Sequence, residues 1–135
     1  MDDRTYLLDS NVCIQLLNGH PKVSAKFKIT GPANIRLCSV VYSELAYGAY
    51  HSSKVVSNLA RLQQFCRPFI SLPLDDRAAD ECGQIRADLR KRGKPIGAND
   101  LLIAAIARAN DLTLVTNDIA EFSRVPDLQI EDWQG

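Results

Sequence analysis

Short apolar, β-prone segments alternate with helical segments along the chain. Five such segments predict strands, at residues 5–8, 35–38, 69–72, 112–115 and 128–130. Longer stretches with helical spacing or helix-end signals predict helices, at residues 10–17, 21–30, 40–50, 55–65, 75–92 and 99–109. This alternation favours an α/β fold with a mainly parallel central sheet of about five short strands, flanked by helices. A length of 135 residues without a repeat, low-complexity tract or linker predicts a single domain over residues 1–135.

Proline, glycine and asparagine mark several of the expected helix ends. Pro21 begins the helix at 21–30, where a missing backbone N–H costs nothing. Gly93 and Pro95 follow the long charged helix and are predicted to end it. Asn99 is predicted to cap the apolar helix that follows.

Cysteine and histidine placement disfavours several chemistries. The gaps between cysteines are wide and contain no C-x-x-C, so neither a disulfide framework nor a zinc site is predicted. We expect buried free thiols of a reducing cytoplasm at Cys13, Cys38, Cys66 and Cys82. His20 and His51 lie in loop-like stretches outside any metal-binding or Ser/His/Asp pattern, and are predicted at the surface. Any catalysis is therefore expected to use carboxylates.

The net charge of the whole chain is zero, but basic and acidic residues are concentrated in different parts of the sequence. Sixteen Lys and Arg residues match sixteen Asp and Glu residues, which excludes a histone-like tail, an acidic disordered protein and a membrane-surface polycation. Residues 19–71 hold seven basic residues and one acidic residue, whereas residues 109–135 hold six acidic residues and one basic residue. The basic half would attract a polyanion such as nucleic acid, although solvated helix faces carry charge as well.

No targeting or membrane pattern is found. The N-terminal sequence MDDRTYLLD is acidic and lacks a signal-peptide pattern, and no apolar run approaches the roughly 20 residues of a membrane span. The expectation is a cytoplasmic protein.

Four acidic residues stand in apolar surroundings. Asp9 and Asp118 follow predicted strands, Glu44 lies within an apolar helix, and Asp100 begins another. Each has a local explanation: Asp9 would cap a helix, Asp100 would complement a helix dipole, Asp118 would form an Asx turn, and Glu44 would be solvated. Taken singly, these explanations stay open.

Taken together, the four acids can converge at one rim of the sheet. Ligands of open parallel sheets bind beyond the carboxyl ends of the strands, where Asp9 and Asp118 are expected. Gly48, one turn after Glu44, would permit close packing beside that carboxylate. Two carboxylates about 4 Å apart repel by roughly 4 kcal/mol at an effective dielectric near 20, and one or two Mg²⁺ or Mn²⁺ ions would remove that repulsion. Oxygen ligands and such ions are typical of phosphodiester hydrolysis.

Four segments carry further information through their order and spacing. They are YLLDSNVCI at 6–14, SVVYSELAYGA at 39–49, GQIRADLRKRGKPIGANDLLIAAIA at 83–107 and LTLVTNDIAEFSRVPDLQIEDW at 112–133. Together they cover about half of the chain. In this arrangement they resemble the PIN-domain ribonucleases of the VapC type, the toxins of bacterial VapBC toxin–antitoxin pairs. The resemblance implies a PIN-like fold.

The resemblance also implies that the four acids form a metal site. Asp9 and Asp100 would be the main ligands, and Glu44 and Asp118 would complete the site directly or through water. The implied cofactor is Mg²⁺, for which Mn²⁺ would substitute.

Two polar residues match positions beside that site. The resemblance implies that Asn11 and Thr116 orient carboxylates or waters. The implied activity is Mg²⁺-dependent hydrolysis of an RNA, either tRNA or rRNA. Cleavage would leave a 5′-phosphate and a 3′-hydroxyl, and loss of the RNA would stop translation.

The implied partners are a VapB-type antitoxin, which blocks the acidic site, and a second copy of the toxin in a homodimer. Higher toxin–antitoxin complexes would bind operator DNA through the antitoxin alone. The antitoxin would dock on apolar residues of the first helix, which could instead belong to the core: Val12, Ile14, Leu16 and Leu17.

Three alternatives are weighed. A haloacid-dehalogenase-like phosphatase needs an acid two positions after its nucleophile, where this chain has Asn11. A receiver-like signalling domain needs an acidic pair at the first strand end, where Asp9 stands alone. A catalytically silent PIN domain that binds RNA or protein is the remaining alternative, and the four intact acids argue against it.

Overall fold

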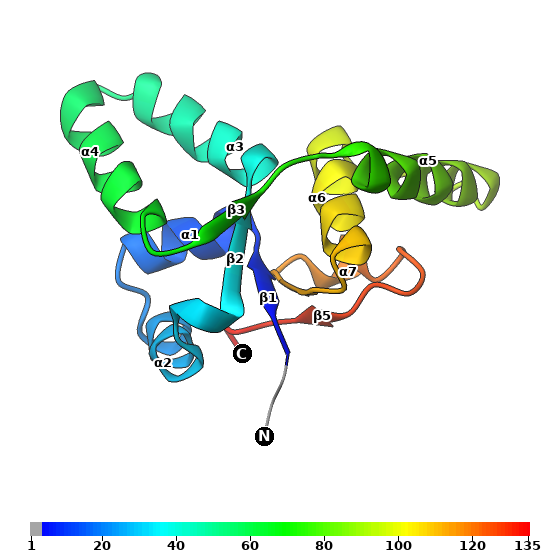
Figure 1. The fold of residues 1–135 in the computed structure, drawn as a ribbon, viewed down its shortest axis with the longest axis horizontal. Helices are drawn as coiled ribbons and strands as arrows, with labels where there is room; N and C mark the ends of the chain where they lie inside the picture. The colour runs from blue at the N-terminus through cyan, green and yellow to red at the C-terminus, as the bar shows by residue number, and fades with distance from the viewer. Residues whose placement is uncertain (1–3) are drawn as a thin grey trace.

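The computed structural model describes residues 4–135 as a five-stranded sheet flanked by helices. The strand order is β3 (Ile70–Leu72), β2 (Ile35–Cys38), β1 (Tyr6–Leu8), β4 (Thr113–Val115) and β5 (Ile130–Glu131). All four pairings are parallel, in line with the mainly parallel sheet that the sequence predicts. Parallel neighbours arise because a helix returns the chain to the starting edge between most strands. Figure 1 shows helices α3 (Ser39–Tyr50) and α4 (Val55–Cys66) forming an arm on one side of β1 and β2, and α5 (Asp76–Lys91) packed on α6 (Ala98–Ala109) on the other.

The strands lie close to their predicted positions. Their bounds are β1 Tyr6–Leu8, β2 Ile35–Cys38, β3 Ile70–Leu72, β4 Thr113–Val115 and β5 Ile130–Glu131. β5 begins two residues later than predicted, because pairing with β4 selects Ile130 and Glu131 as partners of Leu114 and Val115.

The helices also follow the predicted pattern. Their bounds are α1 Ser10–Leu17, α2 Pro21–Thr30, α3 Ser39–Tyr50, α4 Val55–Cys66, α5 Asp76–Lys91, α6 Ala98–Ala109 and α7 Ile119–Phe122. Pro21 occupies the first turn of α2, and Gly93 follows α5 with φ of 68°, a conformation that favours glycine. A short 3-10 turn, Pro32–Asn34, and α7 were not predicted, because three or four residues are too few to establish a helical period.

Two sequence predictions about caps and surface residues are wrong. Gly97, not Asn99, is the N-cap of α6, because the Gly97 carbonyl accepts the first helical hydrogen bond from Leu101 N at 2.9 Å. His20 is half-buried rather than a free surface residue: its Nδ1 accepts a 3.3 Å hydrogen bond from Val23 N and caps α2. His51 is exposed, as expected.

The core lies where the central strands meet the helices. Leu7, Leu8 and Leu114 of the sheet are fully buried, and they belong to one core cluster together with Ile85 of α5 and the apolar residues of α6. All four cysteines are free thiols; Cys13 and Cys38 are buried, whereas Cys66 and Cys82 are partly exposed.

Within residues 4–135, no helix is long and apolar enough to cross a membrane.

The sheet register places two chain segments side by side at its carboxyl edge. Leu8 of β1 pairs with Val115 of β4, so Asp9 and Thr116 leave the sheet together. Asp9 N donates a 2.9 Å hydrogen bond to Val115 O, which continues the ladder to the residue that follows β1.

Candidate active site

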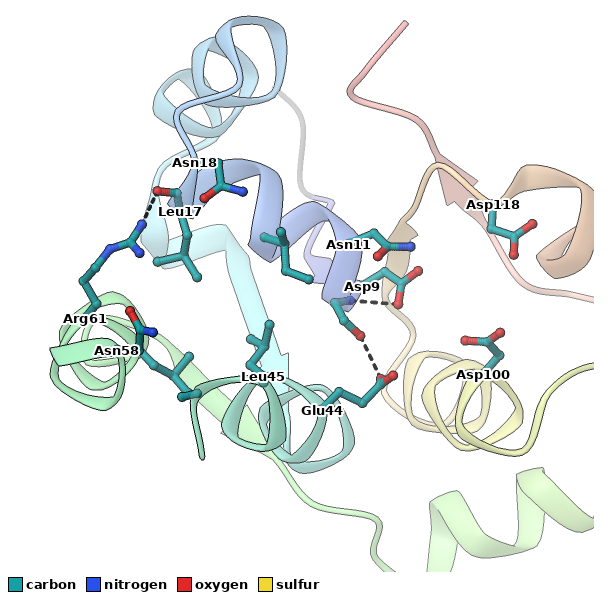
Figure 2. A pocket seen from close by; sticks show the side chains of 15 residues that line it. Asp9, Asn11, Leu17, Asn18, Glu44, Leu45, Asn58, Arg61, Asp100 and Asp118 are labelled. Atoms are coloured by element: carbon teal, nitrogen blue, oxygen red, sulfur yellow. Dashed lines mark hydrogen bonds between the residues drawn. The ribbon is translucent and has the colours of Figure 1, made fainter. Parts of the chain in front are cut away.

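A cavity of about 600 Å³ opens at the carboxyl edge of the sheet. All four predicted acids line it, and Figure 2 shows their carboxylates facing a common space: Asp9, Glu44, Asp100 and Asp118. The opposite end of the cavity lies between α1, α3 and α4. Its apolar lining residues are Ile14, Leu17, Leu45 and Leu62, and polar Asn18, Asn58 and Arg61 line this end as well. The four acids therefore converge at the carboxyl edge of the sheet, as their positions after strands and in helices predicted.

Asp9 is the most buried of these acids, with 5% of its surface exposed. Its Oδ1 accepts a 2.8 Å hydrogen bond from Ser10 N and caps α1, and its Oδ2 accepts a 2.8 Å hydrogen bond from the Thr116 hydroxyl. Burial raises the pKa of Asp9 above its ordinary value, although these two hydrogen bonds oppose the shift. The charges of Glu44 and Asp118 raise it further, which places both acids within electrostatic reach.

Glu44 projects from α3 toward α1. Its Oε1 accepts a 2.7 Å hydrogen bond from the Ser10 hydroxyl, so the side chain is partly buried and oriented rather than freely solvated. Ser10 thus holds two carboxylates at once, Asp9 through its backbone N–H and Glu44 through its hydroxyl. Ser10 is not among the site residues predicted from the sequence, although its place directly after Asp9 is a usable signal.

Asp100 lies in the first turn of α6 and is partly exposed. Burial raises its pKa to about 7, helped by a hydrogen bond with Glu121 and by the charges of Glu121, Asp9 and Glu44. A carboxyl group with this pKa would be half-protonated near neutral pH without a cation.

Asp118 follows β4 in a turn held by Thr116, whose Oγ1 accepts a 3.0 Å hydrogen bond from Asp118 N. The expected Asx turn is therefore replaced by a threonine turn. Asp118 Oδ1 accepts a 3.3 Å hydrogen bond from Glu121 N and caps α7. The hydrogen bond with Glu121 is the main reason that the pKa of Asp118 is raised.

Glu121 is a fifth acid at this site that sequence analysis missed. Carboxylate oxygens of Asp100, Asp118 and Glu121 all lie within 4.8 Å of one another. The N–H of Gly97 donates a 2.7 Å hydrogen bond to Glu121 Oε1, and this hydrogen bond is the main cause that lowers the pKa of Glu121. The pattern Asp118-x-x-Glu121 before an apolar residue is a capping-box signal that could have identified it.

The donor set fits a hard divalent cation. Its atoms are all carboxylate oxygens, drawn from three residues within 4.8 Å, with two further carboxylates lining the same cavity. Burial and neighbouring carboxyl groups raise the pKa values of Asp9, Asp100 and Asp118, and a bound cation would counteract both effects by stabilising the ionised carboxylates. Imidazole and thiolate, the ligands that favour zinc, are missing from the described cavity lining.

Two further sequence predictions concern this site. Asn11 lines the cavity and is exposed, with Figure 2 showing it next to Asp9. Gly48 also lines the cavity, but the close packing expected of it is wrong, since a Cβ at this position would meet no atom within 4 Å.

Known proteins share both the sequence and the fold. The PIN-domain family model matches residues 6–128. Ribonuclease VapC2 of Rickettsia felis is 37% identical over 130 residues, which cover 95% of this chain and 97% of the relative. The tRNA(fMet)-specific endonuclease VapC of Salmonella typhimurium is 37% identical over 131 residues, with the same coverage of both chains.

A solved structure extends the similarity to three dimensions. A chain of the DNA-bound VapBC crystal structure from Salmonella typhimurium superposes with a TM-score of 0.91 at 36% identity, covering 96% of this chain and 98% of that chain. The family predicted from the four sequence segments is confirmed. This chain belongs to the PIN-domain family and, within it, to the VapC ribonucleases.

Proposed function

We propose that this chain hydrolyses RNA phosphodiester bonds at its carboxylate cavity, with Mg²⁺ as the natural cofactor. As a VapC ribonuclease it is an endoribonuclease, and it is the toxin of a toxin–antitoxin pair. The observation that carries the proposal is the convergence of four acids on one cavity, from the residue after β1, from α3, from α6 and from the segment after β4.

In this proposal, Asp9 and Asp100 are the principal metal ligands, and Asp118, Glu121 and Glu44 complete the set directly or through water. When bound, the cation would activate water and stabilise the charge that develops on the phosphate. The remaining chemistry belongs to side chains that hold the carboxylates in place. Thr116 fixes one oxygen of Asp9, and Ser10 fixes the other together with Glu44.

We propose tRNA as the substrate, with rRNA as the alternative. Support comes from the Salmonella typhimurium relative, which is named as a tRNA(fMet)-specific endonuclease. The basic composition of residues 19–71 favours a polyanionic substrate beside the cavity. Arg61 lines the cavity itself, where its guanidinium group donates a 2.5 Å hydrogen bond to Leu17 O (Figure 2).

We propose that a VapB-type antitoxin neutralises this activity by occupying the cavity. Its apolar lining residues would receive the antitoxin next to the carboxylates. Of the residues predicted for docking, Ile14 is 44% exposed and Leu17 lines the cavity, whereas Val12 belongs to the core. Operator DNA would be bound through the antitoxin, in line with the DNA-bound VapBC complex of the relative. The homodimer stays a prediction.

The four free thiols favour a cytoplasmic location for the protein, because thiols stay reduced in that compartment.

The test is a cleavage assay on antitoxin-free protein. Total tRNA and rRNA are incubated with Mg²⁺, Mn²⁺ or EDTA, and the new ends are sequenced. Asp9→Asn runs in parallel, and Asp127→Asn serves as its control because Asp127 is exposed and has a φ of 59° that asparagine tolerates.

We expect metal-dependent cleavage with 5′-phosphate ends, at least about 100-fold slower in Asp9→Asn and unchanged in Asp127→Asn. Folded protein that binds Mn²⁺ without cutting either RNA would favour the catalytically silent alternative. Absence of Mn²⁺ binding would overturn the metal site itself.

A further inference from the structure

A pair of exposed aromatic rings lies one to two turns beyond Glu44, with Tyr47 inside α3 and His51 at its C-cap. The rings of Tyr47 and His51 are nearly parallel, with an interplanar angle of 10° and centroids 5.4 Å apart. Tyr47 is 66% exposed and His51 is also exposed. The core therefore gains little from this pair. Because the rings cover one face of each other, the outer face of each ring is the one available to a ligand.

The pair lies on the same side of α3 as the catalytic carboxylate. At about 100° per residue, His51 falls within about 20° of Glu44 around the helix axis and about 10 Å further along it. Tyr47 occupies the intervening turn. Gly48 and Ala49, which stand between the two rings in sequence, line the carboxylate cavity. Tyr47 and His51 are not themselves among the residues that line the cavity, so the stacked rings lie beside its wall, on the side of α3 that carries Glu44.

The charge of this arm suits a nucleic acid backbone. Between Glu44 and Asp75 the sequence contains no acidic residue, and it contains three permanent cations: Lys54, Arg61 and Arg67. Arg61 reaches the cavity from α4, which packs against α3. A strand whose phosphate lies at the carboxylates could thus pass along the arm without meeting further negative charge.

Exposed planar rings beside cations are the means by which proteins hold unpaired bases. Each base offers a π-face, and its stacking on an aromatic side chain tolerates many sequences. A base next to the cut phosphodiester would stack on Tyr47, the ring of the pair that lies one helical turn from Glu44. Parallel Tyr47 and His51 would thereby receive one or two bases splayed out of an RNA loop.

We propose that Tyr47 and His51 form a base-stacking platform that binds an unpaired nucleotide adjacent to the phosphodiester that is cleaved. This rests on the proposed ribonuclease function and adds to it a determinant of substrate selection. Because stacking requires splayed bases, the platform favours single-stranded loops over RNA duplexes.

The test measures RNA binding separately from cleavage. Antitoxin-free protein in EDTA is titrated into a fluorescently labelled single-stranded oligoribonucleotide, and into one that carries 2-aminopurine as a reporter of stacking. The variants are Tyr47→Ala, His51→Ala and Tyr47→Phe, which keeps the ring. Tyr50→Ala is the matched control, since Tyr50 is 65% exposed on the same helix but lies about 120° around it from Glu44.

We expect Tyr47→Ala to weaken binding by about tenfold and to abolish 2-aminopurine quenching, with a smaller loss for His51→Ala. Tyr47→Phe and Tyr50→Ala should bind as the unaltered protein does. In Mg²⁺, Tyr47→Ala should raise KM for a loop substrate more than it lowers kcat.

Equal RNA affinity of Tyr47→Ala and the unaltered protein would overturn the platform, as would an equal loss in Tyr50→Ala. A change in sedimentation or antitoxin affinity, without a change in RNA affinity, would also overturn it and assign the rings to a protein interface. Failure of the proposed ribonuclease function can be told apart from failure of the platform. In that case neither the unaltered protein nor any variant at position 47 would cut RNA in Mg²⁺.

Discussion

The Thr116 hydroxyl donates a 2.8 Å hydrogen bond to Asp9 Oδ2 in a buried environment, although 107 positions separate the two residues in sequence. The contact exists because β1 and β4 are parallel neighbours whose last residues, Leu8 and Val115, pair in register. Thr116 also accepts a hydrogen bond from Asp118 N, so one hydroxyl organises acids from two chain segments. Thr116 therefore fixes the positions of Asp9 and of the turn at Asp118 relative to each other.

Replacing Thr116 by Val should lower RNA cleavage and Mn²⁺ affinity by about 10- to 100-fold, because Asp9 and the turn at Asp118 both lose a partner. Thr116→Ser keeps the hydroxyl and should stay within a few-fold of the unaltered protein. Mn²⁺ titration calorimetry together with cleavage rates would check this. Equal behaviour of the valine and serine variants would show that the hydroxyl is dispensable.

Removal of the Glu121 charge should weaken metal binding without weakening the fold. Glu121→Gln retains a carbonyl oxygen for Gly97 N–H but leaves two carboxylates in the cluster instead of three. We expect about tenfold lower Mn²⁺ affinity, and metal-free thermal stability at pH 8 that is equal or higher. Unchanged Mn²⁺ affinity would mean that Glu121 does not bind the metal and only holds the segment before α6 through Gly97. Asp127→Asn again controls for the loss of a surface charge.

The metal-free protein should lose stability as pH rises from about 5 to about 8. The pKa of Asp100 is about 7 in the folded state and near its ordinary value of 3.8 when unfolded, so the folded state binds the proton more tightly. Between these values the folded state holds more protons than the unfolded state, and the free energy of unfolding therefore falls with pH. The raised pKa of Asp9 acts in the same direction. The lowered pKa of Glu121 acts oppositely, but only below its ordinary value of 4.5.

Thermal melts in EDTA across this pH range would check the prediction. Asp100→Asn should flatten the pH dependence and melt at least about 3 °C higher at pH 8. Mn²⁺ should stabilise the unaltered protein at pH 8 more than at pH 5, since the ion requires ionised ligands. A melting temperature that rises with pH to the same extent in both proteins would contradict the assignment.

Helix α7 depends on one anchor, Phe122, which is fully buried. Phe122→Ala should lower the free energy of unfolding by about 3–5 kcal/mol, and Phe122→Leu by about 1–1.5 kcal/mol. Because Glu121 precedes this anchor, stabilisation by Mn²⁺ should shrink in the alanine variant. Urea unfolding with and without Mn²⁺ measures both effects. A loss below about 1 kcal/mol on alanine substitution would mean that other contacts hold α7.

The sequence by itself determined the α/β class, the positions of all five strands and the four acids that converge. These were predictable because alternating apolar runs report strands locally, and because an acid after a buried strand of a parallel sheet must emerge at one edge. The resemblance of four ordered segments then indicated the family, which the comparisons confirm.

Tertiary structure alone decided how the acids are held. Ser10 bridges Asp9 and Glu44 across 34 positions, and Glu121 reaches Gly97 across 24 positions. No local pattern encodes either contact, because each requires two helices to pack at one particular separation. The N-cap of α6 is Gly97 rather than Asn99, because the Gly97 carbonyl accepts the first helical hydrogen bond from Leu101 N. The Gly97 N–H gains its partner Glu121 only because α7 lies beside the start of α6. Residue type and spacing thus specify which chemistry is present, whereas packing and register specify which side chains orient it.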